Sequence, residues 1–237
     1  MYYFKDYLAY VLWGAIFDNR AVVAGFTFNT MISYYIIGSF IAQLDQSSGT
    51  GGQISREIRG GQFSKYMVRP MGVFGYFVSQ TVGVSVFLLS FNLIAAVLWV
   101  FVFRVKFVIS YNPFTLLSTL VICGLGLLFM MQLNFYIGIL AFKFLDTGMF
   151  MMIKDNIMQF VTGSLIPLGL LPTLVQDIMR YFPFYYIIYL PSMLLMGENE
   201  GEITVGLVTL IIWNLAFWLL NKLTYKRLRT KYDGVGI

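Results

Sequence analysis

The segment that offers the most chemistry is SREIRGGQFSKYMVRP, which runs from Ser55 to Pro70. It holds one acid, Glu57, and four cations, and long uncharged runs lie on both sides of it. The cations are Arg56, Arg59, Lys65 and Arg69. Clustered cations bind anionic lipid headgroups or the surface of another protein. The segment is therefore a candidate for binding rather than for catalysis.

Residues with catalytic chemistry are scarce. The chain has no histidine, which removes Ser–His and Cys–His nucleophiles, histidine-ligated metal sites and the usual proton shuttle. Asp146 lies in the tripeptide DTG, but aspartic-protease chemistry needs two opposed carboxylates and the tripeptide has no second copy. We expect Asp146 to be a solvated loop acid, and Asp155, beside Lys154, to be a charged anchor at the membrane edge. The sequence predicts neither an enzyme active site nor a metal site.

The glycines around the basic segment do not form a nucleotide site. A P-loop needs Gly-Lys-Ser/Thr at the end of its glycine pattern, and GTGGQISREIRGGQ lacks it. The pieces TGGQ and RGGQ match the signature loop of ATP-binding cassette ATPases, but that loop acts only inside a soluble ATPase domain. The chain has no room for such a domain. We predict no cofactor, and if ATP drives this protein, another chain hydrolyses it.

The same glycines suit a role in the backbone. QISREIR has the pattern of a short helix that Gly60 or Gly61 would end in the left-handed region. Ile54 and Ile58 lie one turn apart on one face of it, with the arginines displaced around that face. Two interpretations remain open: an ordinary basic loop lying on anionic lipid, or a protein-docking site. The capped, amphipathic pattern favours docking.

The composition indicates whether the chain folds in water or in a membrane. Of the 237 residues, 59% are hydrophobic and 11% charged, and the mean hydropathy is +0.76. Soluble chains are about 25% charged, so this chain lacks the polar surface that a soluble particle of its size needs. Its one cysteine, Cys123, cannot form an internal disulfide and is expected to be a packing residue. The sequence predicts a membrane protein.

Five uncharged runs are long enough to cross a bilayer, because a core about 30 Å thick needs about 20 apolar residues per helix. The runs are Ala21–Leu44, Pro70–Phe103, Phe107–Phe142, Asn156–Gln176 and Ile203–Asn221. None shows the strict alternation of a membrane β-barrel. We therefore predict an all-α, polytopic fold with a single membrane domain over residues 1–237. An earlier apolar segment, Tyr7–Phe17, is short, and is either interfacial or the tail of a span that begins before this chain.

Some boundaries of these helices can also be predicted. Asn29 or Thr30 is expected to cap a helix that ends near Asp45, after which the Ser- and Gly-rich run QSSGTGG begins a connection. KFLDTGMFMMIKDN is expected to be a second charged connection. The span that follows it runs to about Leu171 and is interrupted by Pro167.

One segment before the last span has a different character. YFPFYYIIYLPSMLLMG is apolar and aromatic, but it is short and contains Pro183 and Pro191. Broken helices occur at membrane depth where protein or a cavity covers them. We predict a re-entrant or interfacial pair of short helices here, divided at the two prolines.

The distribution of basic residues orients the chain. Lys and Arg near the ends of spans concentrate on the cytoplasmic side. Two clusters, Arg56–Arg69 and Lys222–Lys231, are separated by four predicted spans, and an even number places both clusters on one side. The basic segment and the C-terminus are therefore predicted to be cytoplasmic, and the acidic Glu198–Glu202 to lie outside.

The basic segment resembles a motif of the permeases of type-2 ABC exporters, in particular the prokaryotic permease subunits. These carry R-x-G, an apolar position and then L-L-R-P between their second and third spans. The matching residues are Arg59, Gly61, Phe63, Met67, Val68, Arg69 and Pro70. The match departs from the family at Met67 and Val68, which are apolar but not leucine. The tail is similar as well, with Lys231, Tyr232, Gly234 and Gly236.

The resemblance implies a fold, a mechanism and partners. It implies six spans, the first short or truncated, with a re-entrant segment at Pro183 and Pro191 before the last. It implies a permease that pairs with itself or with a second permease and is driven by cytoplasmic ATPase subunits, which bind the ATP. The segment between the second and third spans would be the coupling helix that docks on the ATPase. Its expected contacts are Ile54, Arg56, Glu57, Ile58, Arg59, Gly60, Gly61, Phe63, Arg69 and Pro70, with Ile54, Ile58 and Phe63 as the apolar ones.

The resemblance also implies export, a multi-pass location in a prokaryotic cell membrane and no nucleic-acid partner. A pathway without buried charge would suit an amphipathic or lipid-like substrate. The alternative is a channel or an ion-coupled secondary transporter. Ion coupling usually leaves an ionisable group inside a span, and the uncharged runs contain none. Intramembrane proteolysis is disfavoured by the missing histidine and the missing second aspartate motif.

Overall fold

A computed structural model describes residues 2–18, 20–103, 107–144 and 147–231. Within these ranges the chain is helical, and its extended pairing is limited to one bridge between Val23 and Phe26. The α-helices are α1 (Tyr2–Phe17), α2 (Phe28–Leu44), α3 (Ser47–Arg59), α4 (Ser64–Met67), α5 (Val73–Phe103), α6 (Pro113–Ile139), α7 (Gly148–Val161), α8 (Thr173–Met179), α9 (Tyr189–Leu195) and α10 (Ile203–Leu228). Short 3₁₀ helices are η1 (Leu140–Phe142), η2 (Leu168–Leu170), η3 (Pro183–Tyr186), η4 (Glu200–Glu202) and η5 (Arg229–Lys231). The all-α prediction is confirmed, while Asp146 and residues 232–237 lie outside the described residues.

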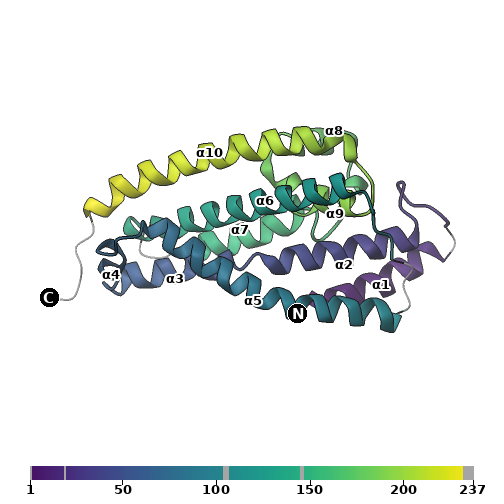
Figure 1. Cartoon of the computed structure of the whole chain (residues 1–237), viewed down its shortest axis with the longest axis horizontal. Coiled ribbons are helices and arrows are strands. Elements are labelled where there is room, and N and C mark those ends of the chain that lie inside the picture. Colours follow the sequence, from purple (N-terminus) through teal and green to yellow (C-terminus); the bar gives the residue numbers. More distant parts are fainter. Residues whose placement is uncertain (1, 19, 104–106, 145–146, 232–237) are drawn as a thin grey trace.

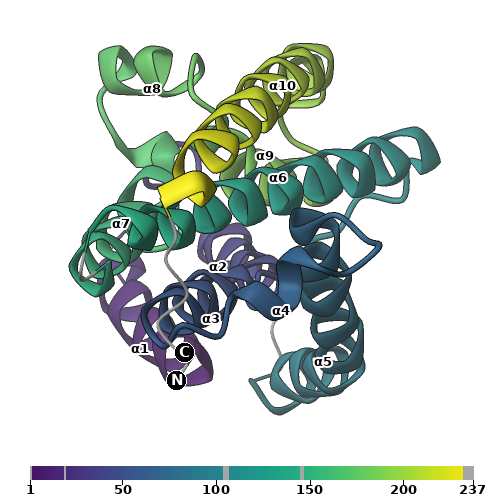
Figure 2. The same cartoon turned by 90° about the vertical axis from the view of Figure 1, so that its left-hand side faces the viewer.

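The longer helices run side by side along the long axis of the molecule (Figure 1). Helices α6 and α10 end, and α5 and α7 begin, toward the end of the bundle where α3 and α4 lie, and α3 continues from the end of α2 toward it (Figure 1). We call this the α3 end. Seen from there, α6 crosses the middle of the bundle, with α10 on one side and α2 and α3 on the other (Figure 2). Both basic clusters predicted from the sequence therefore lie at the same end, and the acidic η4 lies at the opposite end.

Among the described residues, three helices are long and apolar enough to cross a membrane: Val73–Ala95, Pro113–Phe142 and Glu200–Leu228. They correspond to three of the five runs predicted from the sequence. Side chains along α5 and α10 are largely exposed, as on a surface that faces lipid, whereas α6 is more buried. The chain therefore forms a membrane bundle with α6 near its centre.

The first interior boundary shows how local chemistry starts a helix. Thr27 caps α2, and the hydroxyls of Thr27 and Thr30 accept hydrogen bonds from each other's backbone N–H in a reciprocal capping box. The prediction of Asn29 or Thr30 as the cap was wrong, because Thr30 is the third helical residue that completes the box. The predicted end near Asp45 is confirmed, since Asp45 directly follows α2.

The Ser- and Gly-rich run that was expected to be a connection is helical. It forms the first half of α3, although glycine costs about 1 kcal/mol relative to alanine in a helix. The structure supplies the reason. A Cβ on Gly51 would stand 2.7 Å from the carbonyl oxygen of Asn134, and one on Gly138 would stand 3.0 Å from the carbonyl oxygen of Gly51. Glycines at 51 and 138 let the backbones of α3 and α6 touch, as small residues do between membrane helices.

The boundaries predicted for the span that follows the second charged connection were wrong at both ends. Helix α7 begins at Gly148, inside the expected charged connection, and ends at Val161, before Pro167. Gly163 is in the left-handed conformation with φ +78°, which ends the helix after Thr162. Its 14 residues reach about 21 Å, less than the hydrocarbon core of about 30 Å.

The segment before the last span is broken, but not where its prolines suggested. Pro183 begins η3, whereas Pro191 lies inside the first turn of α9, and the break falls between Tyr186 and Tyr189. Proline is tolerated in a first turn because the N–H groups there have no partner within the helix. Both pieces are short and almost entirely buried among α2, α6 and α10.

Candidate functional site

The basic segment folds as a helix, a tight reversal and a second short helix. The N–H of Gln62 donates to the carbonyl of Glu57 at 3.0 Å, and the N–H of Gly61 donates to the carbonyl of Ile58 at 3.2 Å. This is the Schellman pattern of a helix end, and Gly61 has the φ of +72° that it requires. The predicted left-handed glycine is therefore Gly61, while Gly60 keeps a right-handed φ of −80°.

The inner face of this segment is occupied by the chain itself. Ile54, Ile58 and Phe63 are buried at the α3 end in a cluster of side chains that also come from α4, α5, α6 and η1. The whole cluster is Ile54, Ile58, Phe63, Tyr66, Val73, Phe77, Phe135, Ile139 and Ala141. The expectation that these three residues offer an apolar contact to another protein was wrong. An amphipathic helix face requires a cover, and here α5 and α6 provide it.

The outer face carries the cations, and we call it the basic ridge. It consists of the exposed side chains of Arg56, Arg59, Lys65, Val68 and Arg69, and is continued by Pro70. Val68 is 82% exposed, so it is an apolar side chain surrounded by charge. Across the described ranges, no carboxylate pairs with Arg56 or Arg69.

Glu57, the one acid of the segment, links the two short helices that carry the ridge. The Lys65 ammonium lies 2.7 Å from the Glu57 carboxylate, which joins α4 to α3. The hydrogen bond to Glu57 raises the pKa of Lys65 above its ordinary value. The Arg69 guanidinium lies 4.3 Å from the ring centroid of Tyr76, at the start of α5. These contacts hold the ridge in one shape.

A group of polar side chains, which we call the polar junction, lies where α2, α3, α6 and α7 meet. Its members are Asp45, Ser47, Ser48, Asn134, Lys154 and Asp155. Lys154 is only 7% exposed, and its ammonium lies 2.7 Å from Asn134 Oδ1, 3.0 Å from Ser48 Oγ and 2.5 Å from Asp155 Oδ1. Asn134 Nδ2 donates to Ser47 Oγ at 2.7 Å. One buried cation therefore connects α7 to α6 and to the start of α3.

Sequence reasoning missed this group. Lys154 and Asp155 were expected to be a charged anchor at the membrane edge, but they lie inside α7. The available signal was the spacing of Met151, Lys154 and Met158, which places the lysine on a helix face with apolar neighbours. Asp45 accepts hydrogen bonds from the backbone and hydroxyl of Ser47. Burial raises the pKa of Asp45, which follows the last residue of α2 and lies outside that helix.

A cleft of about 570 Å³ opens beside the polar junction, between α2, α6, α7 and the connection from η3 to α9. We call it the α2–α7 cleft. Asp45, Ser48 and Asp155 contribute to its lining, and most of the rest is apolar, including Ile41, Met130, Met158, Leu165 and Ile188. A cleft with an apolar wall and a few polar groups has the character of a small-molecule site.

Arg180, at the opposite end of the bundle, is paired with carboxylates of the same chain. Arg180 lies 2.8 Å from Asp177 and 3.0 Å from Glu202, and its carbonyl accepts a hydrogen bond from the Tyr186 hydroxyl at 2.7 Å. Trp213 Nε1 donates to the carbonyl of Tyr181 at 3.0 Å. We call this the Arg180 cluster. It fastens the chain around α8 to η3 and α10.

A match to a known protein family identifies the class of protein to which these regions belong. The sequence model of a family described as ABC-2 family transporter protein matches residues 5–236. The chain belongs to the ABC-2 transporter family. No curated protein and no solved structure matches it. The resemblance to type-2 ABC permeases is thus confirmed, and this ABC-2 protein is a transporter membrane protein. Among the described residues, no three carboxylate or cysteine side chains gather where they could hold a metal ion.

Proposed function

We propose that this ABC-2 protein is the permease subunit of an ATP-driven exporter and that the basic ridge docks on a separate cytoplasmic ATPase. The observation that carries the proposal is the division of the segment into two faces. Its apolar inner face is packed against α5 and α6, while its outer face presents cations around an exposed valine at one end of the bundle. The segment is therefore firmly fixed to the membrane helices and still open to a partner.

Magnitudes indicate which ridge residue matters most. An exposed ion pair contributes about 0–1 kcal/mol. Covering an exposed valine contributes about 1.5–3 kcal/mol when burial is complete. Val68, rather than Ile54, Ile58 or Phe63, is thus the apolar contact that we propose for the ATPase. Arg56, Arg59 and Arg69 would orient the partner around it.

The contacts behind the ridge suggest how movement is passed on. Helix α3 touches α6 at Gly51 and Gly138, and the polar junction joins the start of α3 to α6 and α7. Thr147, just before α7, also shares a hydrogen bond of 2.7 Å with Ser55. We propose that displacement of the ridge by the ATPase changes the packing of α7 against α6 and thereby the α2–α7 cleft. An amphipathic or lipid-like substrate would use the apolar wall of that cleft.

The arrangement of the helices supports a proposal for the topology. We propose six spans, formed by α1, α2, α5, α6, α7 with the chain after it, and α10, in one membrane domain. The α3 end faces the cytoplasm of a prokaryotic cell, and η3 with α9 is re-entrant from the outer side. A second permease, identical or not, completes the transporter. Single cysteines, in a background with Cys123 replaced, are expected to react from the cytoplasmic side at position 62 and from outside at position 199. Labelling of position 199 only from the cytoplasm would reject this topology.

The docking proposal is tested by placing a charge at the exposed valine. Val68→Asp is expected to reduce co-purification of the ATP-binding cassette ATPase from the native host at least roughly tenfold, as the loss of an apolar contact predicts. Val22→Asp is the matched control, because Val22 is 56% exposed and lies away from the ridge. Both variants should keep wild-type thermal stability. Wild-type ATPase binding by Val68→Asp would reject the ridge as the docking surface.

An ion-coupled transporter is the second candidate, and the burial of Lys154 beside Asp155 in α7 is the observation that favours it. Energy source separates the two. Under the ATPase proposal, transport in proteoliposomes requires ATP on the side of the membrane that the basic ridge faces. Transport persists when ion gradients across the membrane are abolished. Transport that follows an ion gradient without ATP would favour the second candidate.

A further inference from the structure

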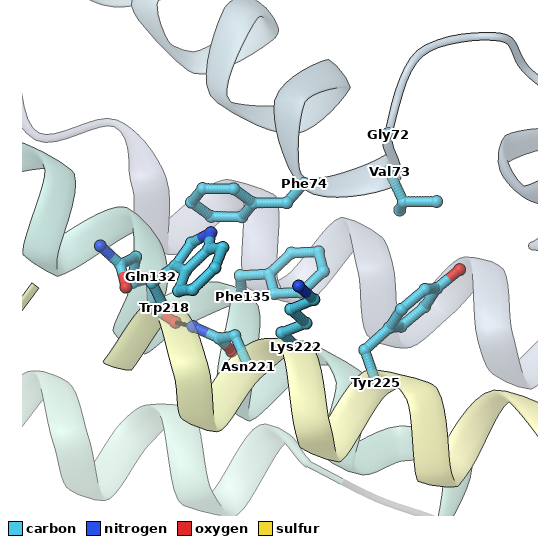
Figure 3. Close-up of a pocket in the computed structure, with 9 residues that line it drawn as sticks. All are labelled: Gly72, Val73, Phe74, Gln132, Phe135, Trp218, Asn221, Lys222 and Tyr225. Atoms are coloured by element: carbon cyan, nitrogen blue, oxygen red, sulfur yellow. Dashed lines mark hydrogen bonds between the residues drawn. The ribbon is translucent and has the colours of Figure 1, made fainter. Parts of the chain in front are cut away.

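A smaller cleft, of about 230 Å³, opens between the start of α5, α6 and the C-terminal half of α10 (Figure 3). We call it the α5–α10 cleft. Its walls include Phe74, Phe135, Trp218 and Tyr225, and no acidic side chain contributes to its lining in the described ranges. It shares no lining residue with the α2–α7 cleft. None of its lining residues belongs to the basic ridge, and nothing in the proposed function uses it.

Two residues that line this cleft each have a buried oxygen atom without a hydrogen-bond partner among the described residues. The two atoms are Gln132 Oε1 and Asn221 Oδ1. The two residues are only 3% and 6% exposed. Buried polar atoms nearly always have a partner, so a ligand that donates hydrogen bonds to these two acceptors would satisfy them.

The hydrogen bonds around these residues fix which atoms are unpaired. Asn214 Nδ2 donates to the carbonyls of Leu125 and Leu210, which leaves its Oδ1 to accept from Gln132 Nε2 at 2.8 Å. Asn221 Nδ2 donates to the carbonyl of Gln132 at 3.0 Å (Figure 3). Turning either amide over would oppose two like groups. The unpaired atoms are therefore acceptors, and the cleft requires a hydrogen-bond donor.

The cleft also carries a cation. The Lys222 ammonium lies 4.9 Å from the ring centroid of Trp218, and across the described chain no carboxylate pairs with it. Lysine and tryptophan side chains of membrane proteins gather at the level of the lipid headgroups. Lys222 also begins the basic tail at the α3 end. An anionic group would complete its contacts.

An exposed apolar stripe leads away from the cleft along α10. Leu215 and Ile211 lie one and two turns before Trp218 on the same helix face, and both are exposed. A ligand whose head fills the cleft could lay a hydrocarbon chain along this stripe. The features together define an occupant with three parts: an anionic group, a hydrogen-bond donor beyond it and an apolar tail.

We propose that the α5–α10 cleft binds one phospholipid whose headgroup carries hydrogen-bond donors, such as phosphatidylethanolamine. The phosphate pairs with Lys222, and the ammonium donates to Gln132 Oε1 and Asn221 Oδ1. An acyl chain lies along Ile211 and Leu215. The site is a lipid site of the membrane domain and is independent of ATPase docking.

Binding of two lipids to the purified full-length protein tests the proposal. Phosphatidylethanolamine and phosphatidylcholine of identical acyl chains are compared by native mass spectrometry after delipidation. Their phosphates are the same, but the choline nitrogen has no N–H to donate. We expect phosphatidylethanolamine to bind at about one per chain and phosphatidylcholine roughly tenfold more weakly, because it leaves both buried acceptors unpaired. Equal binding of the two lipids would overturn the proposal.

Variants locate the site. Lys222→Ala is expected to weaken phosphatidylethanolamine binding severalfold without changing thermal stability in lipid-free detergent, because Lys222 is exposed. Arg227→Ala is the matched control, since Arg227 is an exposed cation on another face of α10 that does not line the cleft. Equal effects of the two substitutions would reject the cleft as the site. So would a cross-link from position 218 to a second copy of the chain that forms at full yield while phosphatidylethanolamine stays bound.

Discussion

The two ends of this ABC-2 protein both attach short helices to the long ones, but they differ in how their charged side chains are paired. At each end, short helices leave the long ones, and buried aromatic side chains hold them: Phe63 and Tyr66 at the α3 end, Tyr185 and Tyr186 at the other. The charges differ. Arg180 is paired with Asp177 and Glu202, whereas the ridge turns its arginines outward, and in the described ranges Arg56 has no carboxylate partner. The comparison teaches that buried aromatic side chains hold the short helices at both ends, whereas, within the described ranges, Arg180 is paired with carboxylates and Arg56 and Arg69 are not.

The largest expected effect tests whether the inner face of the basic segment is structural. Phe63→Ala removes a fully buried ring from the cluster at the α3 end and should lower the free energy of unfolding by about 3–5 kcal/mol. Val68→Ala, on the outer face of the same segment, should change it by less than about 0.5 kcal/mol. Thermal unfolding in detergent compares the two. Unchanged stability of Phe63→Ala together with lost ATPase binding would show that this ring faces the partner after all.

An intermediate effect is expected from the paired charges at the opposite end. Arg180→Met leaves the half-buried Glu202 without its cation and should cost about 1–2 kcal/mol of stability, a reduced figure because Arg180 is itself partly exposed. Arg56→Met is the counterpart on the ridge and should cost less than about 0.5 kcal/mol. The same unfolding assay serves both. Equal costs would remove the distinction drawn between the two ends.

The smallest effect concerns pH and the polar junction beneath the ridge. Burial raises the pKa of Asp45 above that of the unfolded chain, so the folded protein binds the proton more readily. Stability therefore falls as pH rises from the unfolded pKa through the folded pKa. Asp45→Asn keeps an acceptor for Ser47 and removes the titration, so it should unfold at a higher temperature than wild type at neutral pH. The two should converge as the pH is lowered toward 4, and a gap that widens instead would contradict this account.

Sequence reasoning reached the long helices because their signal is local. Each of α5, α6 and α10 is an apolar run of sufficient length, and no distant contact is needed to find it. Helix α3 was only half found, since its glycine-rich start is helical through contact with Gly138, far along the chain. The burial of Lys154 likewise depends on Asn134 in a neighbouring helix.

The candidate site was predicted in position but not in orientation. The pattern of Ile54 and Ile58 correctly gives an amphipathic helix. An apolar helix face, however, says only that something covers it, and not whether the cover is another protein or the same chain. The exposed fractions of the side chains in the structure were needed to assign the proposed apolar contact to Val68. The charged residues are outward in both interpretations, so the sequence identified them directly.

The contact of Gly51 with α6 also constrains how this sequence can change. The carbonyl of Gly51 occupies the space that a side chain at Gly138 would need, and the carbonyl of Asn134 does the same for Gly51. At each of these two positions the backbone of the neighbouring helix leaves no room for a side chain, although no charge or sequence motif marks the position. A protein that keeps this helix pair must therefore keep both glycines. Residues of the basic ridge can change together with the partner that binds there.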